Sequence, residues 1–168
     1  MPAIAIGSTQ TTSLLGSRET NNMENVGEFS LDTGPWAWRG LHRQALRELY
    51  QTSPTARELG NKARGMLVFP RVIKMGSGIG GEYGEGALLT DGRTTDYYNI
   101  ASLSVGFQLG IQRKSVVVLF MTDDALKHFR NSDGWKVGVD SSIAIVTVGV
   151  GGEIDTDTLQ KPVIGFLF

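Results

Sequence analysis

The chain has 168 residues and a mass of 18.2 kDa, which suffices for one domain that buries a core without disulfides or a structural metal. Zero cysteines exclude disulfides, thiolate catalysis and cysteine-ligated zinc, and two histidines are too few for a histidine-rich metal site. The net charge of -1 conceals a basic segment, because residues 36–75 carry eight basic and two acidic residues, a net charge of +6. Such an excess predicts a surface that binds anions.

The first 35 residues are polar and show no sustained hydrophobic period. We therefore predict a disordered tail or leader over residues 1–35 and one domain over residues 36–168. The apolar patch at residues 3–6 is too short for a secretory signal, and no Lys or Arg precedes it. No apolar run approaches the length of about 18 residues that would span a bilayer.

Helical periodicity begins at Trp36 and continues through the basic segment. One face of this first predicted helix is apolar, and arginines recur at every fourth position on another face. The apolar face carries Trp38, Leu41, Ala45 and Leu49, and the arginine stripe consists of Arg39, Arg43 and Arg47. We expect the apolar face to pack on the rest of the domain and to leave the arginine stripe exposed.

A second, shorter helix is predicted over residues 55–64. Ser53 is a suitable N-cap, and Pro54 suits the first helical position. Gly65 is expected to end the helix as its C′ residue.

From Met66 onward the pattern changes to that of β-strands, interrupted by one helix that Thr122 can cap. Turns are expected at Asp91-Gly92 and Asp133-Gly134. The fold class predicted is α+β, with two N-terminal helices packed on a glycine-rich antiparallel β barrel or sandwich with one inserted helix. The expected strands lie within residues 66–69, 71–75, 97–109, 115–121, 137–150 and 162–168.

The stretch GSGIGG at residues 76–81 satisfies the dinucleotide-binding pattern G-x-G-x-x-G. That motif requires a helix next, but Gly84 and Gly86 follow within a few residues and disfavour one. We interpret the glycines instead as strand positions at which another segment approaches the backbone closely or the strand bends sharply.

No set of residues predicts catalysis. Glu82 and Glu85 have odd spacing, so they face opposite sides of a strand, and neither has a His or Tyr partner in sequence. The acidic residues around Asp155 lack the glycine and distal Glu of a calcium loop. His42 and His128 lie on separate helices. We expect no enzyme activity, no catalytic residue, no metal and no cofactor.

The basic segment is therefore the candidate binding site. Tryptophans favour a lipid–water interface, and arginines favour anionic head groups. We expect anionic membrane lipids as the main partner, with an acidic protein face as the alternative and no nucleic acid. The predicted lipid-binding residues are Trp36, Trp38, Arg39, Arg43, Arg47, Lys62, Arg64, Arg71 and Lys74.

Residues 45–168 resemble the SYLF domain, a lipid- and actin-associated module. The resemblance rests on ALRELYQTSPTARELGNKARGMLVFP, KMGSGIGGEYGEGALL, YYNIASLSVGFQLGIQ, VVVLFMTDDAL, SDGWKVGVDSSIAIV and LQKPVIGFLF, in this order. It implies a non-enzymatic domain that binds phosphoinositides or other acidic lipids through basic N-terminal residues, and actin filaments in some eukaryotic members. The alternative that it leaves open is a structural or interaction protein of the bacterial envelope.

SYLF domains usually continue past the stretch that matches residues 163–168, with one more strand. On this comparison we expect either that the chain lacks the last strand of the family and exposes the apolar edge of residues 163–168, or that another segment, such as the polar tail before Trp36, covers that edge. Self-association through that C-terminal edge is the predicted consequence of the first arrangement. The expected location is peripheral to a membrane, in the bacterial periplasm or envelope if a signal has been removed, and otherwise at the cytoplasmic face.

Overall fold

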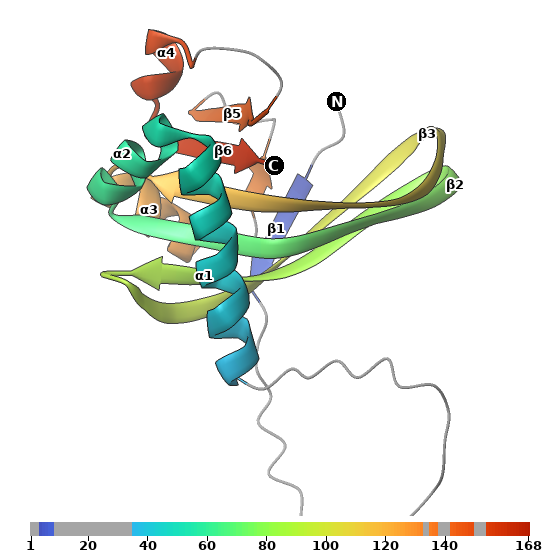
Figure 1. Cartoon of the computed structure of the whole chain (residues 1–168), viewed down its shortest axis with the longest axis horizontal. Coiled ribbons are helices and arrows are strands. Elements are labelled where there is room, and N and C mark those ends of the chain that lie inside the picture. Colours follow the sequence, from blue (N-terminus) through green and yellow to red (C-terminus); the bar gives the residue numbers. More distant parts are fainter. Residues whose placement is uncertain (1–3, 9–34, 133–134, 138–141, 150–153) are drawn as a thin grey trace, which may run out of the picture.

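The computed structural model describes residues 4–8, 35–132, 135–137, 142–149 and 154–168. It confirms the α+β class, with two N-terminal helices, a mostly antiparallel sheet and a helix inserted between strands (Figure 1). The elements in chain order are β1 (Ile4–Ser8), α1 (Pro35–Thr52), α2 (Pro54–Lys62), β2 (Gly65–Thr90), β3 (Arg93–Phe120), α3 (Asp123–Asn131), β4 (Trp135–Val137), β5 (Ile143–Thr147), α4 (Thr156–Leu159) and β6 (Val163–Leu167).

The N-terminal helices form largely where the sequence predicts them. Ser53 caps α2, because its hydroxyl accepts a hydrogen bond from the amide of Ala56 at 3.2 Å. Pro54 follows at the first helical position, where its missing N–H costs nothing. Gly65, however, is not the C′ residue of α2. The helix ends at Lys62 with Ala63 as its C-cap, and Gly65 is the first residue of β2.

The central feature is a hairpin of two very long strands. β2 has 26 residues and β3 has 28, and they pair in antiparallel register from Gly65 opposite Phe120 to Thr90 opposite Arg93. The separate short strands predicted from the sequence are therefore parts of two continuous ones. Pro70 does not end β2, because the register shifts between Phe69 and Val72 and absorbs the residue that cannot donate a hydrogen bond.

A two-residue turn joins the two long strands. Asp91 and Gly92 both have positive φ, 53° and 72°, as a type I′ turn requires. This confirms the turn predicted at Asp91-Gly92. The second predicted turn, at residues 133–134, lies outside the described residues.

The hairpin folds back on itself near its middle. Gly84 lies against the backbone of Arg71, and Gly86 lies against Val68 and Phe69, so β2 reverses close to Gly78. The register also shifts between Gly76 and Gly78, and both glycines pair with glycines of β3. Figure 1 shows both strands running out from the helices and turning back at their far end. The sharp bend and the close backbone approach predicted for this glycine-rich stretch are both present.

The strands form one six-stranded sheet in the order β4-β1-β3-β6-β5, with β2 also paired to β3. All pairs are antiparallel except β5 with β6. β6 therefore lies between β3 and β5, and the prediction of an uncovered C-terminal edge is wrong. Residues 143–147 fall within the strand predicted over residues 137–150, but their pairing with β6 was not predicted.

The N-terminal segment also contributes to the sheet. Residues 4–8 were assigned to the polar tail, but they form β1, which pairs with β3 on one side and β4 on the other. Ile4 and Ile6 alternate with smaller residues, a pattern typical of a strand that is too short to stand out from its polar surroundings. Residues 9–34 lie outside the described part of the chain.

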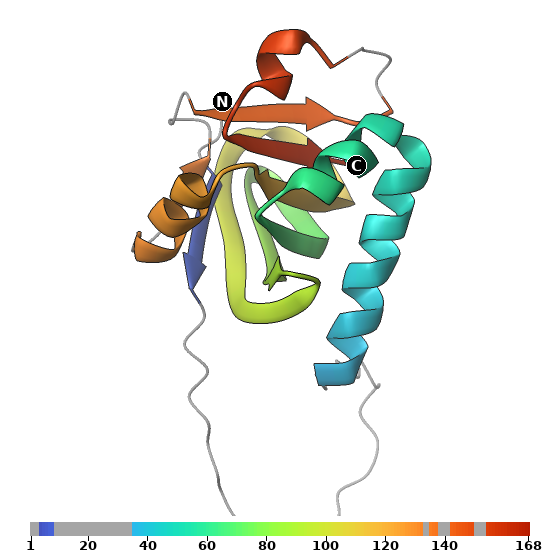
Figure 2. The same ribbon diagram turned by 90° about the vertical axis from the view of Figure 1, so that its left-hand side faces the viewer.

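Two hydrophobic cores lie on opposite sides of the same strands. Alternate residues of β2, β3 and β6 point to opposite sides, so these segments are apolar on both faces. Figure 2 shows α1 and α3 on opposite sides of the sheet. The core on the α1 and α2 side contains Ala45, Leu49, Ala56, Leu59, Val68, Val117, Leu119, Ile164 and Phe166. The core on the α3 side contains Leu67, Phe69, Val72, Leu88, Tyr98, Ile100, Val116, Val118, Phe120, Leu126, Phe129 and Val163.

Candidate anion-binding site

The orientation of α1 determines which of its side chains can meet a ligand. Ala45 and Leu49 are buried against the sheet, whereas Arg43 and Arg47 are exposed. This is the arrangement expected from the periodicity, because residues four apart lie on the same side of a helix. The side chains of residues 36–39, which include both tryptophans and Arg39 of the predicted site, lie outside the described part of the structure.

The other predicted basic residues have different environments. Lys62 and Arg71 are exposed. Arg64 is also exposed, but its Nε lies 3.8 Å from a carboxylate oxygen of Asp123, the first residue of α3. An exposed pair of this kind contributes about 0–1 kcal/mol and leaves the arginine accessible.

Lys74 differs from the rest of the predicted site, because it belongs to an internal ion-pair cluster. Its Nζ lies 3.7 Å from Glu82, and the Nζ of Lys114 lies 2.7 Å from the other carboxylate oxygen of Glu82. The Glu82 side chain is 8% exposed. The cluster links the two halves of β2 to β3, so Lys74 is engaged in holding the folded hairpin together.

Glu82 and Glu85 face opposite sides of β2, as their spacing predicts. Glu82 is buried, whereas Glu85 is exposed and accepts a hydrogen bond from the hydroxyl of Tyr83 at 3.0 Å. Two carboxylates on opposite sides of a strand cannot act on one substrate atom as a general acid and base.

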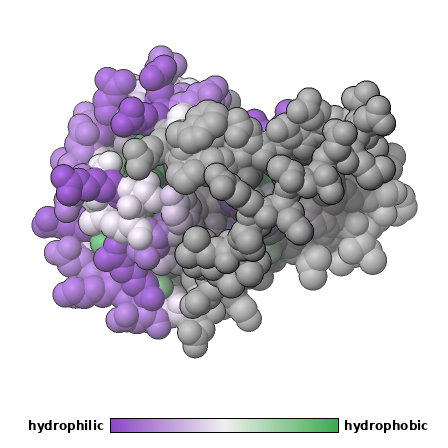
Figure 3. All heavy atoms as spheres, turned by 90° about the horizontal axis from the view of Figure 1, so that it is seen from below, coloured by the Kyte–Doolittle hydropathy of each residue, from purple (hydrophilic) through white to green (hydrophobic). Residues whose placement is uncertain are grey.

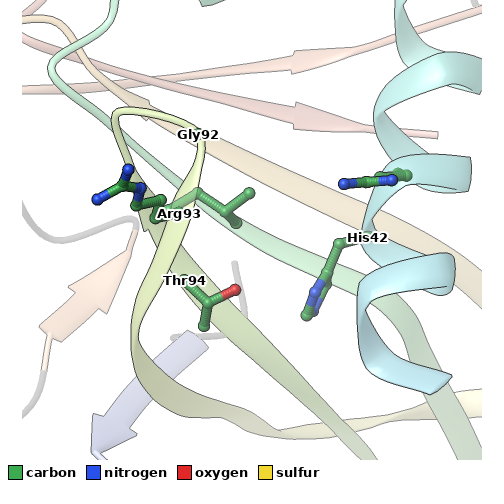
Figure 4. A pocket seen from close by; sticks show the side chains of 6 residues that line it. His42, Gly92, Arg93 and Thr94 are labelled. Carbon is green, nitrogen blue, oxygen red and sulfur yellow. The ribbon is translucent and has the colours of Figure 1, made fainter. Parts of the chain in front are cut away.

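A pocket of about 370 Å³ lies between α1 and the turn that joins β2 to β3. Figure 4 shows His42 on α1 facing this turn, with the Thr94 hydroxyl pointing toward His42 and the Arg93 guanidinium pointing away from it. The pocket brings Arg43 of the predicted site together with residues more than 40 positions later in the chain. Its lining consists of His42, Arg43, Leu89, Gly92, Arg93 and Thr94.

The electrostatic character of this pocket is positive. Its lining contains two arginines and no carboxylate, and neither arginine forms an ion pair with any carboxylate in the described residues. Asp96, near the same turn, is instead engaged by Arg130 of α3, which also donates hydrogen bonds to Thr90 and Thr95. The two arginine charges are therefore available to an anion.

His42 adds a buried titratable group to the pocket. It is 3% exposed, and burial lowers the pKa of its imidazole below the ordinary value of 6.5 because the charged form loses its hydration. At neutral pH the imidazole is therefore neutral. It contributes polar atoms and packing surface to the pocket, and no charge.

Sequence reasoning missed most of this site. Arg43 was identified from its helical spacing, but Gly92 was predicted only as part of the Asp91-Gly92 turn, and Arg93 and Thr94 were not singled out. The Asp91-Gly92 signal locates the end of the hairpin, yet nothing local indicates that α1 packs beside it. Only the folding of the hairpin brings the two segments together.

The remaining candidates have structural roles among the described residues. Asp155 caps the short helix α4, and the hydrogen bond from the amide of Thr158, at 2.7 Å, lowers the pKa of its carboxyl. In the part of the chain that the structure describes, no group of three His, Asp or Glu side chains is arranged to hold a metal ion. Within the same residues, no helix combines the length and hydropathy needed to cross a membrane.

Comparison with known families gives a match for part of the chain. Residues 101–167 match the Ysc84 family, described as a Las17-binding protein actin regulator. The match confirms the SYLF resemblance over the second half of β3 and the elements that follow it. It does not cover α1 or the turn at the pocket. No match was found among curated proteins.

Proposed function

We propose that the chain is a non-enzymatic module that binds anionic lipids through the exposed face of α1, a proposal that the match of residues 101–167 to the Ysc84 (SYLF) family supports. The observation that carries the proposal is the exposure of Arg43 and Arg47 on a helix whose opposite face is buried. Lys62, Arg64 and Arg71 are also exposed and belong to the predicted binding residues, as do Trp36, Trp38 and Arg39, whose side chains lie outside the described part of the structure.

The charge on α1 favours an anionic surface. The helix carries three arginines against one acidic residue, Glu48. Each basic residue near an anionic membrane contributes about 1 kcal/mol, so three arginines would contribute about 3 kcal/mol to the attraction. Screening by salt weakens the attraction beyond about 10 Å at moderate ionic strength.

The packing of α1 indicates that binding is electrostatic. Ala45 and Leu49 are already buried in the core, so they cannot insert into the hydrocarbon region without unpacking the helix. Figure 3 shows that the described surface seen from below is mainly hydrophilic, with small hydrophobic spots. A membrane on the exposed face of α1 would therefore contact Arg43 and Arg47, and binding should be sensitive to salt.

Vesicle co-sedimentation with matched charge variants tests the proposal. The double variant Arg43→Glu/Arg47→Glu should lose binding to vesicles that contain phosphatidylserine, with an unchanged circular dichroism spectrum. The control Arg113→Glu/Lys127→Glu makes the same change in net charge at exposed positions on β3 and α3, and should retain most of the binding. An equal loss of vesicle binding in both variants, or vesicle binding that does not change with salt concentration, would show that the α1 face is not the lipid site.

The family description favours a second candidate, a protein partner of actin-regulating type. The same basic face of α1 could contact an acidic protein surface. Co-sedimentation with actin filaments, in the absence of lipid, tests this candidate. Filament binding that is lost in Arg43→Glu/Arg47→Glu, combined with no binding to vesicles, would replace the lipid proposal.

A further inference from the structure

We infer that the outer edge of β5 pairs with β5 of a second copy of this chain, in antiparallel register about a two-fold axis at Ile145. Such pairing would continue one sheet through two molecules. The inference goes beyond the proposed function, because it involves neither α1 nor a lipid. The edge also differs from the one that the sequence indicated, since residues 163–167 are paired on both sides.

The outer edge of β5 is open to another strand. β5 stands at one end of the strand order, beyond β6 (Figure 1). Among the strands that the structure describes, β5 pairs with β6 alone. None of the five residues of β5 is buried, whereas four of the five residues of β6 are. The side of β5 that faces away from β6 therefore presents unpaired backbone groups.

The composition of β5 favours the addition of a strand. Proteins protect exposed strand edges with charged side chains, prolines or very short strands. β4, at the other end of the strand order, has three residues, and one of them is Lys136. In contrast, residues 142–149 contain no charged residue and no proline. Four of the five residues of β5 are β-branched, the type that favours strands. The edge of β5 thus lacks the features that prevent strand addition.

The backbone groups of alternate residues point outward from this edge. The amide of Val148 donates a hydrogen bond to the carbonyl oxygen of Leu167 at 2.8 Å, so Val148 turns its backbone groups toward β6. Because this direction alternates along an extended chain, Ile143, Ile145 and Thr147 direct their N–H and C=O groups away from β6. These are the groups with which an added strand would pair.

A second copy of β5 suits the edge because the strand is complementary to itself. With Ile145 opposite Ile145 of the second copy, Ile143 lies opposite Thr147, and each of these pairs exchanges two backbone hydrogen bonds. The strand carries no charge, so the pairing brings no like charges together. The Ile145 side chain is 45% exposed, more than any other large aliphatic side chain in the described residues. The pairing would cover it with its own copy.

Sedimentation velocity of the full chain over a range of concentrations, without lipid, tests the inference. We expect an equilibrium between monomer and dimer. Ile145→Lys should raise the dissociation constant of the dimer at least tenfold, a change of about 1.4 kcal/mol, because two ammonium groups would meet across the axis. Tyr97→Lys is the matched control. It adds the same charge at a position on β3 that is 43% exposed, and it should leave the dissociation constant unchanged.

Thr147→Pro tests the backbone pairing separately from the side-chain contact. Proline removes the outward N–H of this residue and leaves Ile145 in place, and the hydrogen bonds to β6 use the intervening residues. The variant should also raise the dissociation constant at least tenfold. A circular dichroism spectrum like that of the wild type shows that each variant is folded.

Cross-linking tests the register. The chain has no cysteine, so a single introduced cysteine reports on one position. Ile145→Cys should be joined to its own copy across the axis by a short thiol reagent. Thr147→Cys should react much less, because its two copies would lie four residues apart along the strands, about 13 Å.

Three results would overturn the inference: a monomer at every concentration, a dimer that persists in both Ile145→Lys and Thr147→Pro, or equal cross-linking at positions 145 and 147. None of these results affects the lipid proposal. In turn, Arg43→Glu/Arg47→Glu should dimerise like the wild type, so a failure of the lipid proposal would leave the dimer standing.

Discussion

His42 connects the packing of α1 to the pocket that it lines. Its imidazole is almost completely buried, and burial lowers its pKa below 6.5. The unfolded chain therefore takes up a proton on this residue at a higher pH than the folded chain does. Stability rises with pH wherever the unfolded state binds more protons, so acidification should weaken the fold.

We expect the free energy of unfolding to fall as the pH drops below about 6.5, and the fall to be shallower in His42→Gln. Urea unfolding at about pH 7 and about pH 5, followed by circular dichroism, measures the difference. His128→Gln is the control, because His128 is exposed on α3, and it should keep the dependence of the wild type. An identical pH dependence in wild type and His42→Gln would contradict this account.

At the scale of elements, β2 lies against itself. A Cβ at Gly86 would lie 2.5 Å from both the ring of Phe69 and the carbonyl oxygen of Val68, closer than real contacts allow. The two halves of the strand can approach this closely only because the position has no side chain.

Gly86→Ala should therefore destabilise the protein by about 1–3 kcal/mol through overpacking. Gly40→Ala provides the matched control on α1, where a Cβ would meet nothing within 4 Å, and it should stabilise the helix by about 0.4–1 kcal/mol. Denaturant unfolding measures both changes. If Gly86→Ala left the free energy of unfolding unchanged, the two halves of β2 would separate easily.

The sequence predicts well which segments are helices and which are strands. It predicts poorly which short strands join into one continuous strand. The first three helices and the Asp91-Gly92 turn depend on neighbouring residues, and they were predicted correctly apart from the end of α2, but the short helix α4 was not predicted. Pro70 was expected to end a strand, whereas the glycines near Gly78 were expected to be strand positions with a close backbone approach or a sharp bend. In the structure, register shifts accommodate them inside one long strand.

Errors in the topology have a different origin. β1 and β5 are five-residue strands whose partners lie far away in the chain, and local pattern contains no information about such pairing. The same holds for the candidate site. Arg43 follows from helical spacing, whereas Arg93 reaches the pocket only through the folded hairpin.

At the scale of the whole molecule, two cores share one set of strands. Val117 and Leu119 of β3 point to the α1 side, and Val116 and Val118 point to the α3 side. A disturbance of one core must therefore move the strands that form the other. We expect the molecule to unfold as one unit.

Phe166→Ala tests this coupling, because Phe166 is fully buried in the core on the α1 side. The substitution should lower the free energy of unfolding by about 3–5 kcal/mol. Hydrogen exchange should show equal loss of protection in α3 and in α1. Leu159→Ala, at an exposed position on α4, should change neither stability nor exchange. A loss of hydrogen-exchange protection that is confined to α1 and α2 would mean that the two cores unfold separately.

The position of β6 constrains the order in which the protein can be assembled during synthesis. Residues 163–167 pair with residues 116–120 of β3, and they supply Ile164 and Phe166 to the core beneath the N-terminal helices. The helices and the long hairpin leave the ribosome first, yet their shared apolar surface stays open until β6 has been made. For the time needed to translate about 40 residues, a few seconds, this surface is exposed to chaperones and to other nascent chains.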